Sequence, residues 1–427
     1  MCLCLINLFF RIKQLVFDKY KNYMKKQKLP SILAIDTSCD ETSVAISHGN
    51  TILTNVVASQ TQLHAPYGGV FPTIAKQAHQ ENIESTTAMA LKRAQLNFEQ
   101  IDAIAVTQGP GLAPALEIGI AKAKELANKH KKPLIAVNHI EGHILSVLAE
   151  AKKRKKITSK TNQTQPHKYT KNSNLKFKIN NSQLSFPILS IVISGGHSQF
   201  ILIEDIGKYK LIGQSIDDAA GECLDKVGRM LDLGYPAGPV IEQFAKLGDE
   251  NKFKFPLPMT ASNNYNLSFS GLKTYSRNLI AKLEKDRQLN KQATYDFCAS
   301  LQKAVFRHIC HKLNKILSNN FKLSASGKKT QIQKIYLGGG VAANSKLREM
   351  LRQTIKQSYL KSNDDIKKEV KGPLQLITPY SKKLCGDNAA MISIVAFYKF
   401  LKKEFVENFD QLDRKPRWPV TKIYTQC

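Results

Sequence analysis

Short apolar runs alternate with small polar turns along this chain, in an order that occurs twice. In the first copy the apolar run Ile32–Ile35 meets the polar turn Asp36–Thr42, and an alternating segment, a Gly49–Asn50 turn and a third apolar segment follow. The second copy begins at Phe186, and its polar turn is Ser194–His197. This pattern predicts three strands in each copy. We therefore expect a duplicated α/β core with a cleft between its two halves.

Two further predicted strands are each followed by a glycine-rich turn and a helix. The segments begin at Ile101 ("IDAIAVTQGPGLAPALEIGIAKAKELANKH") and at Lys334 ("KIYLGGGVAANSKLREMLRQ"). Glycines between a strand and a helix N-terminus leave backbone N–H groups that can bind phosphate. One such turn is weak support, but four small-residue turns around one duplicated core favour a nucleotide-binding cleft.

The stretch "AVNHIEGHILS" places His139 and His143 four residues apart, after a predicted buried strand. Asn138 is suited to cap a helix that starts at His139, and residues i and i+4 lie on one helix face. The two imidazoles could then share a metal ion, but two ordinary histidines on an amphipathic helix explain the pair equally well. A third ligand must come from elsewhere in the chain.

A zinc-protease motif does not fit this pair. That motif needs a glutamate directly after the first histidine, and Ile140 occupies this position. Glu141 lies about 200° around the predicted helix from His139. We expect it to point away from the metal or to support the site from behind.

Composition adds a class of partner. The 427 residues are enough for two or three domains, and 42% are hydrophobic, which excludes wholesale disorder. The 63 Lys and Arg against 34 Asp and Glu give a formal net charge of +29, which favours a polyanion such as nucleic acid over a merely solvated surface. Eight cysteines without a C-x-x-C motif indicate neither a disulfide framework nor a zinc ribbon, and fit a reducing compartment.

Nine short motifs follow one another along the chain. They are DTSCDETSVAI (36–46), GPGLAPAL (109–116), NHIEGH (138–143), SGGHSQ (194–199), IDDAAGECLDKVGRML (216–231), YPAGP (235–239), LSFSGLKT (267–274), GGGVAANSKLR (338–348) and CGDNAAMI (385–392). In this order, over about residues 31–400, they resemble the tRNA N6-adenosine threonylcarbamoyltransferases of the TsaD type, formerly called glycoproteases. The resemblance implies an α/β, duplicated actin/Hsp70/sugar-kinase-like (ribonuclease H-like) two-lobe fold.

The resemblance also implies the missing metal ligand. Asp387 matches the family's metal-binding aspartate, although taken alone it could instead cap the following helix. His139, His143 and Asp387 would then hold one divalent metal ion as a two-histidine, one-carboxylate set. Iron(II) is the first expectation for this set and zinc the alternative.

The ligand implied for the cleft is threonylcarbamoyl-AMP. The matching positions are Val192, Ile193, Ser194, Gly195, Gly196, Asp225, Gly238, Glu242 and Asn344. By resemblance Asp225 binds the ribose hydroxyls, whereas the alternative is an acid on a helix surface. Asn344 by resemblance reads the adenine, whereas the alternative is a helix cap. Asp36, Asp40 and Glu41 are candidates for proton handling or for organising the phosphate side, with no single base identified.

Two positions depart from the family pattern. Thr73 stands where many members carry a glutamate, which puts a cleft or partner contact there in doubt. Ala237 stands where a second glycine is usual. A Cβ costs little unless φ must be positive, so only a slight local shift is expected.

The expected segments run as follows: a basic extension 1–30, a first lobe 31–150, a basic insertion or linker 151–186, a second lobe 187–387, a helix at about 388–405 that packs back on the first lobe, and a tail 406–427. No apolar run reaches the length of a membrane span, so no membrane partner is expected. A cytoplasmic location is expected, or the mitochondrial matrix if the extension is a presequence. The pattern of the extension fits a start codon assigned too far upstream, or a short amphipathic tail, equally well.

The expected reaction is transfer of a threonylcarbamoyl group from its adenylate to N6 of the adenosine next to the anticodon of tRNAs reading codons that begin with adenine. By resemblance to bacterial members the partners are tRNA, a paralogous subunit of the same fold class and a small ATPase. The alternatives are a kinase of this fold, which would not need the histidine pair and Asp387, and a non-catalytic paralogue, which would be expected to have lost the ligands.

Overall fold

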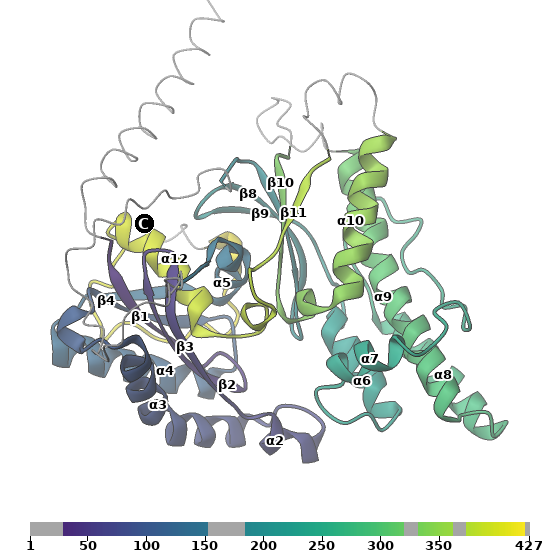
Figure 1. Cartoon of the computed structure of the whole chain (residues 1–427), viewed down its shortest axis with the longest axis horizontal. Helices are drawn as coiled ribbons and strands as arrows, with labels where there is room; N and C mark the ends of the chain where they lie inside the picture. The colour runs from purple at the N-terminus through teal and green to yellow at the C-terminus, as the bar shows by residue number, and fades with distance from the viewer. Residues whose placement is uncertain (1–28, 153–183, 320–331, 362–372, 423–427) are drawn as a thin grey trace, which may run out of the picture.

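The computed structural model describes residues 29–152, 184–319, 332–361 and 373–422 of the chain (Figure 1). The extension at 1–28 and most of the expected insertion, at 153–183, lie outside these residues. Each of two lobes is built on one mixed sheet, and the strand orders are β5-β4-β1-β2-β3-β6 and β11-β10-β7-β8-β9. The order β5-β4-β1-β2-β3 in the first sheet recurs as β11-β10-β7-β8-β9 in the second. The predicted duplicated two-lobe α/β fold is therefore confirmed.

The two sheets also share their strand directions. In the first, β1, β2 and β3 pair antiparallel, whereas β4 and β5 add on as parallel strands. The second repeats this with β7, β8 and β9 antiparallel and β10 and β11 parallel. The strands are β1 (Ser31–Asp36), β2 (Glu41–His48), β3 (Thr51–Ser59), β4 (Ala103–Gly109), β5 (Leu134–Asn138), β6 (Glu150–Ala151), β7 (Ile188–Ile193), β8 (Ser198–Asp205), β9 (Lys208–Gln214), β10 (Lys334–Gly338) and β11 (Gln375–Ile377).

Helices cover both faces of the first sheet. Along β1, Ile32 and Ala34 face α12, while Leu33 and Ile35 face α3 and α4. Because both faces are covered, the strand is apolar throughout and does not alternate. The helices of this lobe are α2 (Thr61–His64), η1 (Ala65–Tyr67), α3 (Pro72–Ala94), η2 (Phe98–Gln100), α4 (Ala113–His130), α5 (His139–Leu145), η3 (Ser146–Leu148) and α12 (Ala389–Leu401).

The second sheet is covered by its own helices on one face only. Leu189, Ile191 and Ile193 pack against them, whereas Ile188 and Val192 face the core shared with the first lobe. The remaining helices are α6 (Ala220–Met230), α7 (Ala237–Ala245), α8 (Ser270–Lys285), α9 (Lys291–Ser318), η6 (Gly340–Ala343), α10 (Ser345–Leu360), η7 (Lys382–Leu384) and η8 (Val420–Lys422).

Two helices join the lobes. Helix α12 follows the second lobe in sequence but packs on β1 and β2 of the first, and it contacts α5. Helix α5 also packs against β7 and β10 of the second sheet, so it lies between the lobes (Figure 1). None of the helices in the described part of the chain combines the length and apolar character that a membrane crossing requires.

Candidate metal centre

The histidine pair lies on a short helix that begins where the predicted cap stands. Asn138 Oδ1 accepts hydrogen bonds from the backbone N–H groups of Ile140 (2.9 Å) and Glu141 (3.3 Å), which confirms the predicted N-cap. Every residue of α5 is buried. One helical turn separates His139 from His143, so their rings lie on the same face.

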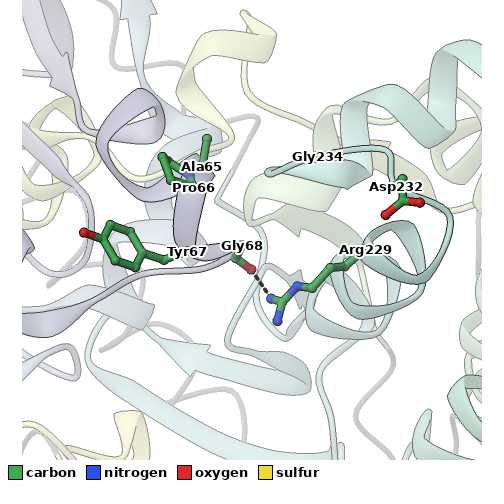
Figure 2. A pocket seen from close by; sticks show the side chains of 7 residues that line it. All are labelled: Ala65, Pro66, Tyr67, Gly68, Arg229, Asp232 and Gly234. Carbon is green, nitrogen blue, oxygen red and sulfur yellow. Dashed lines mark hydrogen bonds between the residues drawn. The ribbon is translucent and has the colours of Figure 1, made fainter.

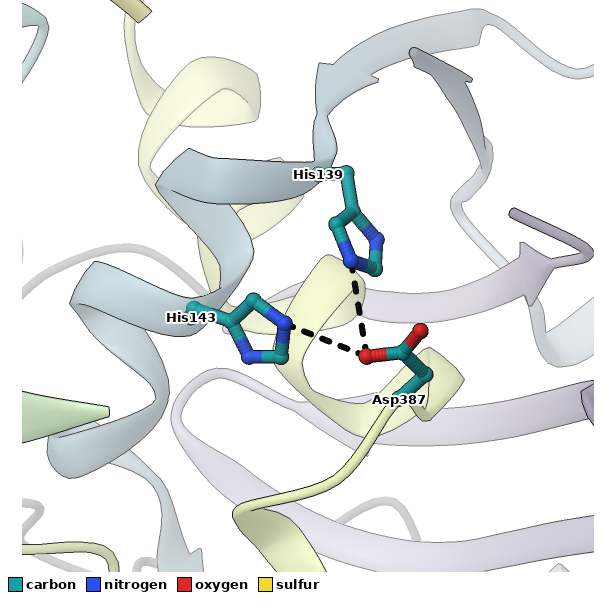
Figure 3. A group of neighbouring side chains, drawn as sticks. All are labelled: His139, His143 and Asp387. Atoms are coloured by element: carbon teal, nitrogen blue, oxygen red, sulfur yellow. Dashed lines mark ion pairs between the residues drawn. The ribbon is translucent and has the colours of Figure 1, made fainter. Parts of the chain in front are cut away.

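Asp387 meets both imidazoles from the chain that enters α12. Its Oδ1 lies 3.4 Å from His139 Nε2 and 3.1 Å from His143 Nε2 (Figure 3). The two rings meet edge to face with centroids 4.7 Å apart. Asn388, not Asp387, caps α12 by accepting from the Met391 N–H. The carboxylate of Asp387 is therefore left to face the histidines.

The donor set fits one divalent metal ion. Two ligands that each bind an ion at about 2.0–2.2 Å stand about 3.0–3.5 Å apart when the angle at the ion lies between octahedral and tetrahedral values. Both distances from Asp387 Oδ1 fall in this range, and the ligand atoms of the three residues lie within 4.8 Å of one another. His143 Nε2 is buried without a well-directed hydrogen bond. The group could therefore hold a metal.

Charge in the triad is shared between one carboxylate and two rings. Burial disfavours an imidazolium, but Asp387 outweighs it and raises the pKa of His139 to about 9. For His143 burial prevails over Asp387 and, with His139 adding to it, lowers the pKa. Burial disfavours the charge of Asp387, yet the two histidines hold its pKa well below the usual range. A proton on His139 therefore competes with a metal for its ring nitrogen.

Glu141 points away from the triad, which is one of the two orientations expected from the sequence. Its Oε1 accepts a hydrogen bond from the Tyr209 hydroxyl at 2.8 Å, and burial raises its pKa. The buried carboxyl thus ties α5 to β9. It has no place as a base on the metal side.

The turn after β1 approaches the triad from the first lobe. Asp36 Oδ1 accepts from Thr107 Oγ1 (2.7 Å) and from the Ser38 N–H (3.2 Å), and lies 3.9 Å from His139 Nδ1. Asp40 is also buried. Burial, Asp40 and Asp387 together raise the pKa of Glu41 to about 10. A cation bound at the triad would oppose this rise, because it favours the charged form of the carboxyl.

The glycine turn of the second lobe opens to solvent only at its tip. Val192 and Ile193 are fully buried at the end of β7, so a contact of these two residues with the ligand through the strand end stays a prediction. Ser194 accepts through its carbonyl oxygen from the Gly221 N–H at the start of α6 (3.3 Å). A Cβ on Gly195 or Gly196 would meet no atom within 4 Å. The two glycines are therefore the part of this turn that a ligand can approach.

Asp225 braces the start of α7. Its Oδ1 accepts from the backbone N–H groups of Ala237 (2.9 Å) and Gly238 (3.0 Å), and burial raises its pKa despite these bonds. Asp225 therefore has hydrogen-bond partners within the protein, and its contact with the ribose stays a prediction. Ala237 is fully buried with its Cβ directed at Gly228, and its φ is not positive. The methyl group of Ala237, at a position where the family pattern has glycine, fits because Gly228 has no side chain.

Glu242 and Asn344 also serve tertiary contacts. Glu242 Oε1 accepts from the Ser345 N–H at the start of α10 (2.9 Å). Asn344 Oδ1 caps α10, and its Nδ2 donates to Gln302 Oε1 (2.7 Å). The helix-cap alternative is therefore what this structure contains. The bond to Gln302 uses one of the two Nδ2 hydrogens of Asn344, so the adenine contact stays a prediction.

Three residues that sequence reasoning did not assign also face this region. Burial, His139 and His143 lower the pKa of His197 to about 4, and burial with Asp40 raises the pKa of Tyr235. Arg229 donates to the Gly68 carbonyl oxygen across the lobes beside a pocket of about 330 Å³ (Figure 2). The pocket is lined by Ala65, Pro66, Tyr67, Gly68, Arg229, Asp232 and Gly234. His197, Tyr235 and Arg229 stand inside quoted motifs, which was the available signal.

Comparison with known proteins shows the family to which the chain belongs. The family model described as tRNA N6-adenosine threonylcarbamoyltransferase (TsaD) matches residues 51–157 and 173–394. A relative of that name from Pelagibacter ubique (strain HTCC1062) is 38% identical over 400 residues, covering 92% of this chain and 96% of the relative. One from Thermosipho africanus (strain TCF52B) is 41% identical over 372 residues, covering 87% and 94%. The chain belongs to the tRNA N6-adenosine threonylcarbamoyltransferase family.

Proposed function

We propose that this protein transfers the threonylcarbamoyl group of threonylcarbamoyl-AMP to N6 of the adenosine next to the anticodon, in tRNAs that read codons beginning with adenine. The products are N6-threonylcarbamoyladenosine and AMP. Family membership supports this reaction. The observation that carries it is the joining of His139, His143 and Asp387, from distant segments, with the glycine turn at Gly338 against the backbone of His143.

The chemistry requires positioning more than a covalent nucleophile. The N6 amine attacks the carbamoyl carbon, the bond from this carbon to the phosphate oxygen breaks, AMP leaves, and N6 loses a proton. The amine is weak because its lone pair is conjugated into the ring, while the carbamoyl group is already activated. Fixed geometry and charge stabilisation therefore lower the barrier.

Each lobe has its own part in this proposal. Gly195 and Gly196 would hold the phosphate side of the adenylate, and Asp225 the ribose. Asp36, Asp40 and Glu41 would organise the phosphate side or handle the proton released from N6. When bound at the triad, an iron(II) ion, or zinc as the alternative, would polarise the threonylcarbamoyl carbonyl.

The proposal extends to the partners. The net charge of +29 would dock the tRNA through phosphate contacts. As in bacterial members, a paralogous subunit of the same fold class and a small ATPase would complete the system, in the cytoplasm. A kinase of this fold remains the second candidate class, but it offers no use for the buried triad.

Purified protein, tRNA and threonylcarbamoyl-AMP test the reaction directly. Mass spectrometry of the digested tRNA should show N6-threonylcarbamoyladenosine with the parent protein, and none with His139→Ala/His143→Ala. The partner subunits are added in a parallel reaction. Unmodified adenosine in every mixture, from a parent that carries its metal, would contradict the proposal, and ATP hydrolysis coupled to a sugar would favour the kinase.

A further inference from the structure

Residues 413–420, here called the strap, cross the strand ends that carry the site. After α12 the chain bonds to the edge strand of the first sheet, where the Val406 N–H donates to the Leu134 carbonyl oxygen at 2.8 Å. The strap then passes the ends of β4 and β5. At η8 the chain packs against β9 of the second lobe.

The strap is bonded first to the end of β4. Gln108 Nε2 donates to the Asp413 carbonyl oxygen and the Lys415 N–H donates to the Gln108 carbonyl oxygen, both at 2.8 Å. The Gly111 N–H donates to the Pro416 carbonyl oxygen at 3.2 Å. A Cβ on Gly109 would collide with the Lys415 carbonyl oxygen. The glycine therefore allows the strap to lie directly on this turn.

The turn beneath the strap contacts Ser38, in the segment that carries the candidate residues Asp36, Asp40 and Glu41. The Leu112 N–H donates to the Ser38 carbonyl oxygen at 2.8 Å, and a Cβ on Gly111 would lie 2.5 Å from the same oxygen. Ser38 in turn donates its N–H to Asp36. Contacts thus run without a gap from the strap to Asp36, whose Oδ1 lies 3.9 Å from His139 Nδ1.

The strap next holds the cap of the metal helix. Asn138 caps α5 with its Oδ1, and its Nδ2 donates to the Trp418 carbonyl oxygen at 3.0 Å. One amide side chain therefore fixes both the first turn of α5, which begins at His139, and the strap. Trp418 and Val420 are buried, and Val420 belongs to the core cluster that contains α5 and α12 residues.

We propose that the strap is a positioning element for the metal site, with Asn138 coupling strap docking to metal binding. The inference rests on the metal site proposed above. A docked strap holds the Asn138 amide in the orientation that caps α5, and so keeps His139 facing Asp387. Coupling of this kind is reciprocal, so metal binding must also stabilise the docked strap.

The chain carries its own reporter of docking. Trp418 is the only tryptophan of the 427 residues, it is 9% exposed, and Lys415 Nζ lies 4.9 Å from its ring centroid. Zinc(II), which does not absorb in the visible range, is titrated into metal-free protein while Trp418 emission is followed. The emission should change and saturate at one zinc per chain.

Asn138→Ser separates the cap from the strap bond. Serine is as good a cap but has no amide to reach the Trp418 carbonyl oxygen. We expect about tenfold weaker zinc binding against a competing chelator, which is the effect of losing an outer support of a metal ligand. Trp418 emission should be shifted to the red before zinc is added. Parent-like zinc affinity in this variant would overturn the inference.

A second pair of variants displaces the strap and keeps the Asn138 amide, with Gly109 lying opposite Asn138 in the β4–β5 pairing. Gly109→Ala drives a methyl group into the strap, whereas the matched Gly271→Ala, in α8, meets no atom within 4 Å. Only the former should weaken zinc binding and shift the emission. If the parent binds no zinc, the metal site and this inference both fail. If it binds zinc with no change in emission, this inference alone fails.

Discussion

Two of the three metal ligands, His139 and Asp387, stand next to an asparagine that caps a helix. Asn138 fixes the turn that carries His139, and Asn388 takes the capping role that would otherwise occupy Asp387. We expect alanine at His139, His143 or Asp387 to reduce bound metal to background, because two remaining ligands hold a divalent ion poorly. Atomic emission spectrometry of the purified proteins measures this content.

The matched control for these variants is His130→Ala. His130 ends α4 and stacks on Phe98, away from the triad, with ring centroids 3.9 Å apart. It should keep its metal. Full metal content in His139→Ala/His143→Ala, with circular dichroism like that of the parent, would disprove the site.

Asp225 is expected to matter for the nucleotide and not for the metal. Asparagine at this position keeps an oxygen for the Ala237 and Gly238 N–H groups but removes the charge that a ribose diol prefers. Losing a charged hydrogen bond costs roughly 1.5–3 kcal/mol, or about ten- to a hundredfold in affinity. Calorimetry with a stable adenylate analogue decides between this and a purely structural role, for which affinity would be unchanged.

For single residues, the sequence predicted the features that depend on neighbours along the chain. The cap at Asn138 follows from its neighbours, whereas Asp387 was reached only by resemblance because its partners lie in a distant segment. Asn344 was assigned to adenine, but its amide bonds depend on Gln302, which only the tertiary structure brings near. Burial of Val192 and Ile193 likewise depends on which strands flank β7.

Between elements, α6 and α7 meet at a contact that a double-mutant cycle can measure. Gly228→Ala would place a methyl group against the Ala237 Cβ, and overpacking of this kind typically costs about 1–3 kcal/mol. Ala237→Gly in the same chain should recover most of that loss, since it empties the space. Urea unfolding gives the four free energies. Additive losses would mean that the two side chains do not share the space.

Helix α9 carries a histidine that should make the protein acid-sensitive. His308 Nε2 accepts from the Ser268 N–H at 3.1 Å, so the folded ring is neutral. Burial and Lys312 lower its pKa to about 4, against 6.5 when unfolded. Between these values the unfolded chain binds more protons, and stability falls by up to roughly 1.4 kcal/mol per pH unit as pH decreases.

His308→Gln keeps an acceptor for Ser268 but does not titrate. Its unfolding free energy should decline less than that of the parent between pH 6.5 and 4, as measured in urea at several pH values. Equal slopes would place the acid sensitivity elsewhere in the chain.

Strands and helices in which the apolar residues follow one clear spacing could be predicted from the sequence. The apolar runs and tight turns around β1 and β7 predicted the duplicated strands, because each turn is set by local residues. Helix α9 is different: its 28 residues include buried positions on all sides, so no single face indicates how it packs.

For the whole molecule, the charge of +29 predicts salt-dependent tRNA binding. Each phosphate contact contributes about −0.9 to the log–log salt slope on duplex B-DNA and about −0.7 on single strands. Deleting Lys152–Lys178, most of which lies outside the described residues, should flatten the slope if the insertion touches RNA. Filter binding at several salt concentrations measures it, and an unchanged slope would leave the insertion a linker.

The chain crosses between the lobes between β6 and β7 and between β11 and α12, and it reaches the second lobe again where η8 packs on β9. Asp387 lies on the second crossing, and α5 shortly precedes the first. Any rotation of one lobe against the other must be absorbed at these crossings, so atoms beside them move least. The metal ligands thus sit near the pivot of such a motion. The Arg229–Gly68 bond joins the lobes at none of these crossings, so such a rotation would strain or break it.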